Sequence, residues 1–410
     1  MNKERLLLLA VAAVQFTNVM DFMIMMPLGP QLMRTFNINP QEFSVLVSSY
    51  TFSAGIFGFL AAFFIDKFDR KTAILTVYMG FTIGTLMCGL SDSYVLLLAA
   101  RIITGIFGGL LGALVLSIVG DAIPLERRAT AMGTVMAAFS VASVVGVPFG
   151  LYLATSYNWQ MPFLLLAFLG LIVLFLIYRF ITSMTLHLEK VKTKAHPFDF
   201  VLSITKNGNQ LLALSLMVFM MLSQFSYISM LSPYMVSNVG FTEHQLTYIY
   251  LIGGAVTIFS SPFVGKLADK FGRARIFTIF SILMMGPTIY LTSIGHTPIA
   301  MVLAITSLNF IFISGRMIPG STMVTAAVLP QNRGSFMSIN ASVQQLSSGL
   351  GAFLAGIIVH KNPADGLIMN YNYVGYFAMA ASVISIIIAN NLKAIDTNQP
   401  SAIKHVVDHA

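Results

Sequence analysis

The stretch that decides the fold of this chain runs from residue 265 to residue 275 and reads Gly-Lys-Leu-Ala-Asp-Lys-Phe-Gly-Arg-Ala-Arg. It lies between two long apolar runs, and its pattern G-x-x-x-D-x-x-G-R-x-R predicts a tight, charged turn between two helices. An imperfect copy occupies residues 62–71 and reads Ala-Phe-Phe-Ile-Asp-Lys-Phe-Asp-Arg-Lys. Asp66 in the first copy and Asp269 in the second are separated by 203 positions. Because the chain has 410 residues, about twice that offset, the repeat indicates one unit used twice.

The same offset of 203 positions relates residues outside the turn, in the first helix of each unit and at its exit. The equivalent pairs are Asp21 with Gln224, Phe22 with Phe225 and Pro30 with Pro233. Internal symmetry of this kind is common in secondary transporters, whose binding site lies between the repeats. We therefore predict two homologous halves at 1–181 and 210–395, a linker at 182–209 and a tail at 396–410.

The composition predicts a membrane protein, because 57% of the residues are hydrophobic and only 9% are charged. Apolar runs of about 20 residues recur along the chain, and this is the length that a helix needs to cross a bilayer. A large soluble core does not explain runs of this length. We predict an all-α protein with twelve membrane-spanning helices in two pseudo-symmetric groups of six. The expected spans are 6–32, 43–65, 72–90, 94–119, 130–154, 162–181, 211–236, 246–265, 275–294, 298–327, 335–359 and 372–392.

The distribution of positive charge predicts the orientation of these spans. The net charge of +8 does not indicate nucleic-acid binding, because the basic residues are divided among short loops. Almost all of them fall on the side of the two chain ends, and only Arg34 and Lys361 fall on the other. Cytoplasmic loops carry an excess of lysine and arginine, so both termini are expected in the cytoplasm.

The repeated turn resembles the loop signature of the major facilitator superfamily, which lies between helices 2 and 3 and again between helices 8 and 9. The first copy departs from the signature with Ala62 and Asp69 at positions where glycine is usual. Aspartate tolerates a left-handed backbone better than most residues, so we expect the turn to be kept. The resemblance also implies a cytoplasmic gate, formed by a charge cluster of Asp66, Arg70 and Asp121, with Asp269 and Arg273 in the second copy.

Three ionisable side chains are predicted to lie well inside spans: Asp21, Arg101 and Arg316. Charges at membrane depth are costly and mark a functional site by default, although a structural ion pair or a helix cap is the alternative. Arg101 opens the sequence Arg-Ile-Ile-Thr-Gly, which resembles the R-x-x-x-G signature on helix 4 of proton-driven members of the superfamily, with Thr104 where glutamine is usual. The resemblance implies that Arg101 takes part in proton transfer, and Asp21 is the predicted proton carrier.

Arg316 opens a similar sequence, Arg-Met-Ile-Pro-Gly, but we expect it to lie deeper toward the cytoplasm. Two roles remain open for it: binding an anionic group of a substrate, or pairing with backbone carbonyls near Pro319.

Neutral polar residues at helical spacing predict a substrate cavity between the halves. Gln15, Asn18 and Asp21 share one broad face of the first helix, and Asn340 and Gln344 share a face of helix 11. Tyr50, Gln224, Tyr227, Asn309 and Arg316 complete the predicted lining. Hydrogen bonding between helices is the alternative role for these residues. The mixture suits an amphipathic or polar organic solute better than an inorganic ion.

The sequence Gly146-Val147-Pro148-Phe149-Gly150 resembles the helix 5 signature of antiporters, in the form found in sugar-efflux and drug-efflux members. We expect Gly146 and Gly150 to let helices 5 and 8 approach closely and Pro148 to bend helix 5. Ordinary close packing in a helix bundle is the alternative.

The interpretation is a proton-coupled exporter of a small drug, sugar or metabolite in the inner membrane of a bacterium, monomeric and without cofactor or metal. Its expected partners are the substrate, protons and the lipid bilayer. Proton symport or facilitated uptake of a siderophore, sugar or amino acid is the alternative. An enzyme is not expected, because the sequence has neither H-E-x-x-H nor a phosphate-cradling G-x-x-x-x-G-K-[ST].

Overall fold

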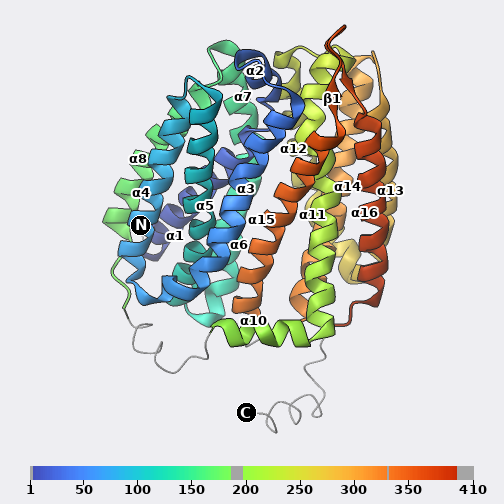
Figure 1. Ribbon diagram of the computed structural model, residues 1–410. Helices are drawn as coiled ribbons and strands as arrows, with labels where there is room; N and C mark the ends of the chain where they lie inside the picture. The colour runs from blue at the N-terminus through green and yellow to red at the C-terminus, as the bar shows by residue number, and fades with distance from the viewer. Residues whose placement is uncertain (1–2, 186–196, 330–331, 395–410) are drawn as a thin grey trace.

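The protein is an all-α membrane bundle. The computed structural model describes residues 3–185, 197–329 and 332–394, and these contain twelve helices long and apolar enough to span a membrane (Figure 1). In the N-terminal half the spans are α1 (Lys3–Ile24), α3 (Pro40–Phe64), α4 (Arg70–Gly89), α5 (Tyr94–Ala122), the continuous rod of α6 (Leu125–Val141), η2 (Ala142–Gly146) and α7 (Val147–Ser156), and α8 (Met161–Phe180). In the C-terminal half they are α11 (Gly208–Tyr234) extended by η4 (Met235–Val239), α12 (Glu243–Phe271), α13 (Arg273–Ser293), α14 (Ile299–Ala326), α15 (Arg333–Ile358) and α16 (Tyr371–Asn391). The predicted fold class is confirmed.

The two ends of the bundle differ in structure. On the linker side, at the bottom of Figure 1, α8 ends, α11 begins and α16 ends, and the amphipathic helix α10 (Pro197–Lys206) lies across the bundle. On the hairpin side, at the top, β1 (His360–Lys361) pairs antiparallel with β2 (Ile368–Met369). The Asn238 amide holds this hairpin, accepting a hydrogen bond from the Ile368 N–H and donating one to the Ile368 carbonyl.

The internal repeat extends to the start of the second helix in each half. Asn39 caps α3 by accepting a hydrogen bond from the Glu42 amide, while the Glu42 side chain accepts one from the Asn39 amide. At the equivalent positions Thr242 and Gln245 make the same reciprocal pair at the start of α12. Such capping boxes satisfy backbone donors that a helix leaves unpaired, so both halves begin this helix in the same way.

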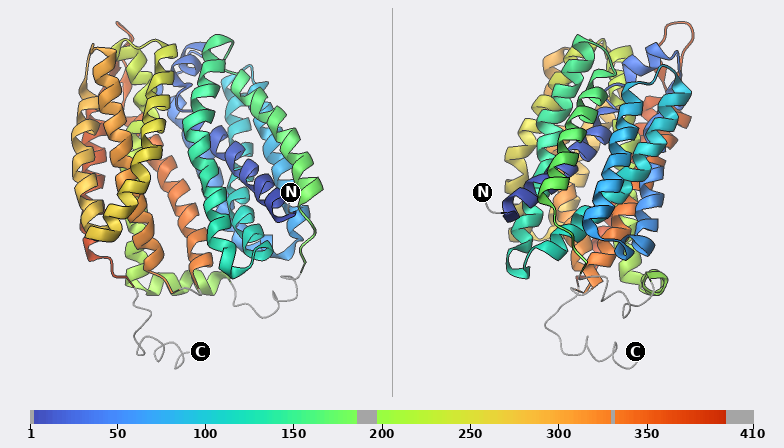
Figure 2. Two further views of the ribbon diagram at one scale, coloured as in Figure 1. Left: turned by 180° about the vertical axis from the view of Figure 1, so that it is seen from behind. Right: turned by 90° about the vertical axis from the view of Figure 1, so that its left-hand side faces the viewer.

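Apolar packing joins the halves on the hairpin side. One large buried cluster contains residues of both halves, among them Ile24 and Phe43 from the first and Tyr227 and Leu246 from the second. Toward the linker side the core divides into one cluster made only of N-terminal residues and another made only of C-terminal residues. The apolar cores of the two halves are therefore joined at the hairpin side and separate toward the linker side (Figure 2), while α3 and α15 stay in contact as far as Gly58 and Ser342.

Polar and aromatic contacts between the halves follow the same distribution. Arg34 Nη1 lies 2.7 Å from Glu243 Oε1, and the Ser44 hydroxyl donates to the Ala352 carbonyl. Tyr152 and His244 form an edge contact with their ring centroids 6.3 Å apart. All of these residues lie on the hairpin side.

The two copies of the charged turn differ in backbone. Gly272 has φ +93°, a conformation that favours glycine. Asp69 has φ −56°, so our expectation of a left-handed residue there is wrong. Asp69 is instead the N-cap of α4, accepting a hydrogen bond from the Thr72 amide. Its other oxygen accepts bonds from the Met184 amide at 2.6 Å and the Ser183 hydroxyl at 3.0 Å, which attaches the chain leaving α8 to this turn.

Local irregularities were not predicted. The first span ends at Ile24 and is followed by a separate short helix, α2 (Gly29–Thr35), after Pro27. Helix α10 lies within the predicted linker, of which residues 186–196 lie outside the described part of the chain, as does the predicted tail.

Candidate functional site

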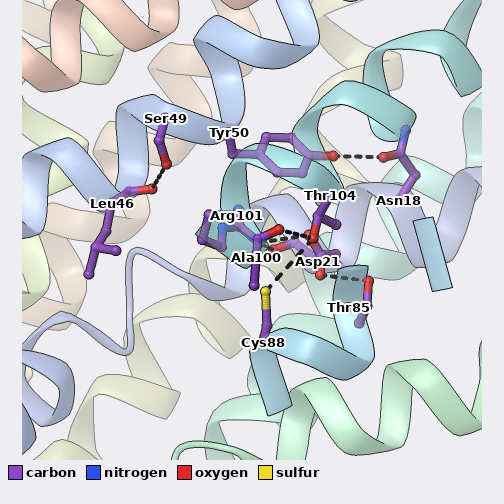
Figure 3. A network of polar contacts seen from close by, with 10 residues as sticks. All are labelled: Asn18, Asp21, Leu46, Ser49, Tyr50, Thr85, Cys88, Ala100, Arg101 and Thr104. Atoms are coloured by element: carbon purple, nitrogen blue, oxygen red, sulfur yellow. Dashed lines mark hydrogen bonds and ion pairs between the residues drawn. The ribbon is translucent and has the colours of Figure 1, made fainter. Parts of the chain in front are cut away.

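A buried ion pair between α1 and α5 is the centre of the site (Figure 3). Arg101 Nη1 lies 2.7 Å from Asp21 Oδ2, and both side chains are 0% exposed. The same nitrogen also donates to the backbone carbonyl of Asp21 at 3.3 Å. On the other carboxylate oxygen, Asp21 accepts a hydrogen bond from the Thr85 hydroxyl at 3.2 Å. The structure thus brings together the two residues predicted to couple protons, with Thr85 of α4 as a third member.

Tyr50 of α3 covers this pair. The Arg101 guanidinium carbon lies 4.4 Å from the centroid of the Tyr50 ring, a distance at which the cation is attracted to the ring face. The Tyr50 hydroxyl donates to Asn18 Oδ1 at 2.8 Å, and the Asn18 amide donates to the Gly108 carbonyl at 3.4 Å. A Cβ atom on Gly108 would overlap the Tyr50 hydroxyl, so glycine is required there for the ring to lie as it does.

The ion pair is fully buried, but its hydrogen bonding is incomplete. Two of the nitrogens of Arg101, Nε and Nη2, are buried without a hydrogen-bond partner. Two charges in an apolar interior stabilise each other only while both are present, and removing one leaves a costly unpaired charge. The arrangement can therefore work as a switch, in which a proton on Asp21 releases Arg101 and departure of the proton restores the pair.

The equivalent hydrogen-bond network of the C-terminal half is made of uncharged side chains. The Tyr227 hydroxyl donates to Asn309 Oδ1 at 2.7 Å, and the Asn309 amide donates to the Thr288 hydroxyl at 3.3 Å. Thr288 is the residue of the second repeat that corresponds to Thr85. Tyr227 and Asn309, predicted to line a cavity, here form hydrogen bonds between helices, the alternative that the sequence left open.

Arg316 is fully buried inside the C-terminal half. It donates to the Met220 carbonyl at 2.6 Å, to the Ser223 hydroxyl at 3.2 Å and to the Ser382 hydroxyl at 3.4 Å, so it joins α14 to α11 and α16. The carbonyl that it contacts belongs to α11 and not to the chain near Pro319. No acidic side chain forms a salt bridge with it among the residues that the structure describes.

The remaining predicted cavity residues have less defined contacts. Asn340 is buried, and neither atom of its amide has a hydrogen-bond partner. Gln224 is partly buried with its Oε1 unpartnered. Gln15 and Gln344 are partly buried. Their role as a substrate lining stays a prediction.

Comparison with known proteins identifies the family. The model of the Major Facilitator Superfamily matches the chain twice, over residues 11–226 and 212–404. The chain belongs to the major facilitator superfamily. This is a family of transporters and not a class of enzymes, and the protein is a multi-pass membrane protein that carries a small-molecule substrate.

Relatives within the superfamily are distant in sequence. The chain is 22% identical over 360 residues to the uncharacterized MFS-type transporter YceJ of Bacillus subtilis, covering 88% of this chain and 90% of the relative. It is 23% identical over 367 residues to Multidrug resistance protein 2 of the same organism, covering 88% and 90%. The putative transporter AraJ of Escherichia coli is 24% identical over 347 residues, covering 83% and 82%.

Solved structures of the superfamily share the fold. A bacterial homologue of the human lysosomal transporter Spinster, in an inward-facing and unoccupied conformation, superimposes with a TM-score of 0.77 at 16% identity, covering 96% of this chain and 98% of that one. A D-xylose-proton symporter superimposes with a TM-score of 0.75 at 16% identity, covering 95% and 97%.

The major facilitator turn places part of the predicted gate in contact. Arg70 Nε lies 2.8 Å from Asp121 Oδ2, with Arg70 buried and the Asp121 side chain 34% exposed. Both residues belong to the N-terminal half, on α4 and at the end of α5. Asp66 lies in the short helix η1 (Ile65–Lys67), and its side chain lies outside the described part of the chain. In the second copy Asp269 and Arg273 are exposed.

The helix 5 motif packs differently from our prediction. A Cβ atom on Gly146 would lie 3.1 Å from Met20 Sδ, and one on Gly150 would lie 2.9 Å from Ile24 Cδ1, so both glycines face α1. The expectation that they bring helices 5 and 8 together is wrong. Helices 5 and 8 come close at a glycine of helix 8 instead: a Cβ on Gly254 of α12 would lie 3.0 Å from the Cα of Val144 in η2.

Pro148 is the second residue of α7, just beyond the π-helical turn η2, whose C-cap Val147 donates its amide to the Ala142 carbonyl. Proline lacks the amide hydrogen that a regular helix uses, so a break in the α-helical pattern at this point has a clear cause.

Proposed function

We propose that this protein is a proton-coupled exporter of a small organic compound that works by alternating access. The observation that carries the proposal is the fully buried Asp21–Arg101 pair on α1 and α5, at membrane depth. Ionisable residues at that depth are costly and are a hallmark of ion and proton pathways. Asp21 is the carboxylate that would carry the proton, and Arg101 is the cation that would expel it.

The orientation follows from the distribution of basic residues. Arg34 and Lys361 lie on the hairpin side, whereas the linker side carries most of the others, among them Lys67, Lys71, Arg127, Lys206, Lys266, Lys270, Arg273 and Arg275. The positive-inside rule supports a cytoplasmic linker side, with both termini in the cytoplasm of a bacterium. In that orientation the structure, closed on the hairpin side, corresponds to an inward-open state of a monomeric transporter.

Export is preferred to uptake because of the helix 5 motif and the likeness to Multidrug resistance protein 2. Proton symport or facilitated uptake is the second candidate. It is favoured by the departures of the motif from the antiporter signature, with Ala142 in place of glycine and Pro148 one position late.

Transport measurements separate these functions. A compound found by thermal stabilisation of the purified protein, across a panel of drugs and metabolites, serves as the substrate. Vesicles of known orientation are then given a pH gradient. Export predicts that the compound moves against its gradient in the direction opposite to the protons. Movement with the protons identifies a symporter, and movement that ignores the pH gradient identifies a facilitator.

A further inference from the structure

We propose that Phe225 is a positioning residue for the Asp21–Arg101 pair and acts through two intervening rings, so that access of water to the pair depends on how the two halves lie against each other. The inference rests on the proposed function in one respect, that Asp21 exchanges protons with water. It adds the element that ties this exchange to movement of the halves.

A continuous row of rings leads from the C-terminal half to the ion pair. The Phe225 ring of α11 lies 5.8 Å from the Phe22 ring of α1, and Phe22 stacks on Tyr50 with centroids 5.7 Å apart. Tyr50 in turn lies over the Arg101 guanidinium at 4.4 Å. A displacement of α11 is therefore transmitted to the cover of the ion pair through direct contacts.

Burial changes in steps along this row. Asp21 and Arg101 are completely buried, Tyr50 is 2% exposed, and Phe22 and Phe225 are only partly buried. The two phenylalanines thus mark the boundary between the sealed pair and the space between the halves. In Figure 3 the Tyr50 ring extends across the network with its hydroxyl on Asn18, which fixes its orientation.

The repeat explains why this contact follows movement of the halves. Phe22 and Phe225 occupy equivalent positions in the two repeats, separated by 203 residues. When equivalent residues of two related units touch each other, the contact lies on the axis that relates them. Phe22 is two residues from the hairpin-side end of α1. The contact therefore lies toward the side on which the halves are closed. Opening on the hairpin side separates Phe22 from Phe225 and frees Tyr50 to move away from Arg101.

The chain contains a natural reporter of this change. Cys88 of α4 is the single cysteine, is fully buried, and lies beside the ion pair with its sulfur 3.8 Å from the Thr104 hydroxyl. Its rate of modification by a small, neutral thiol reagent measures how often the site opens, and this measurement requires no substrate.

The test compares Phe225→Ala with a matched control, Phe353→Ala. Phe353 also makes an aromatic contact between the halves, with Phe52 at 6.5 Å, but this contact does not lead to the ion pair. We expect Phe225→Ala to raise both the Cys88 modification rate and the substrate-free proton flux in proteoliposomes by about three- to tenfold, the change that loss of one aromatic pair produces. Phe353→Ala is expected to leave the Cys88 modification rate and the proton flux at the wild-type level. Phe225→Tyr, which keeps an aromatic ring at this position, is expected to give wild-type values as well.

Phe225→Leu keeps a large apolar side chain and provides the same comparison if Phe225→Ala does not fold. Wild-type Cys88 modification and proton flux in these variants would overturn the role of the ring row. The proposed function would stand in that case if Asp21→Asn still abolishes the proton flux that a substrate gradient drives. If Asp21→Asn also leaves this substrate-driven proton flux unchanged, the proposed function itself fails.

Discussion

Thr85 and Thr288 occupy equivalent positions in the two repeats and bind chemically different partners. Thr85 donates a hydrogen bond to the Asp21 carboxylate, whereas Thr288 accepts one from the Asn309 amide. One ancestral position therefore serves a charged network in the N-terminal half and a neutral network in the C-terminal half. In the proposed function the titrating chemistry belongs to the first half, and the two threonines form a matched pair for experiment.

Thr85→Val is predicted to move the pH of half-maximal transport upward by about one to two units. The hydroxyl stabilises the ionised carboxylate, so its loss favours the protonated form, and a hydrogen bond to a charged group is worth about 1.5–3 kcal/mol. Thr288→Val is the control, with an unchanged pH profile and a loss of about 1 kcal/mol in the free energy of unfolding. Equal pH profiles for Thr85→Val and the wild type would show that Asp21 does not set the pH dependence.

Asp121→Asn is predicted to slow turnover with little loss of folded protein. The substitution keeps the shape of the side chain but removes the charge that faces the buried Arg70 at 2.8 Å. Since both residues lie in the N-terminal half, on α4 and at the end of α5, the contact between them is within one half and lies on the linker side. The measurement is transport rate together with the distribution of conformations, reported by distances between spin labels on the two halves. An unchanged rate and distribution would reject the gate.

Asp69→Ala is predicted to lower the free energy of unfolding by about 1–2 kcal/mol, through loss of a helix cap and of the bond to Met184. Burial opposes ionisation of Asp69, but the hydrogen bonds from Met184, Thr72 and Ser183 outweigh it and hold the pKa of this carboxyl below its usual value. A group with a lowered pKa stabilises the fold at every pH above its ordinary value of about 3.9 and loses that effect as the pH falls through the lowered one.

The difference in thermal unfolding between wild type and Asp69→Ala should accordingly be constant from pH 8 to pH 5 and shrink only in stronger acid. Asp69→Asn, which keeps an acceptor oxygen for the cap, should lose less. A difference that disappears already near pH 6 would contradict this account of the turn.

Much of the fold could be predicted from the sequence, because span length and the 203-residue repeat are strong signals in an apolar chain. The pairing of Asp21 with Arg101 could also be anticipated, since few charges are tolerated at membrane depth. The face on which a residue lies was harder to predict. Gly146 faces α1 and not α12, and Asn309 forms hydrogen bonds between helices. These orientations are hard to predict because lipid and protein neighbours are both apolar, so the sequence carries little pattern that defines the rotation of a helix about its axis.

Asp69 shows a different limit of prediction from sequence. The sequence reveals that the usual glycine of the turn is missing, but it does not reveal that Asp69 binds the distant Met184. The bond from Met184 joins positions 115 residues apart, and no local pattern encodes it. The signal that could have revealed Thr85 was the repeat itself, because Thr288 stands at the matching position.

The most direct test of the central claim, that Asp21 carries the coupled proton, is transport by Asp21→Asn in proteoliposomes with and without a pH gradient. The variant keeps the shape of the side chain but cannot titrate. We predict that it loses accumulation driven by the pH gradient, while exchange of substrate at equal pH on both sides continues and no longer depends on pH. Accumulation driven by the pH gradient at the wild-type rate, with the wild-type pH profile, would show that the proton takes another route.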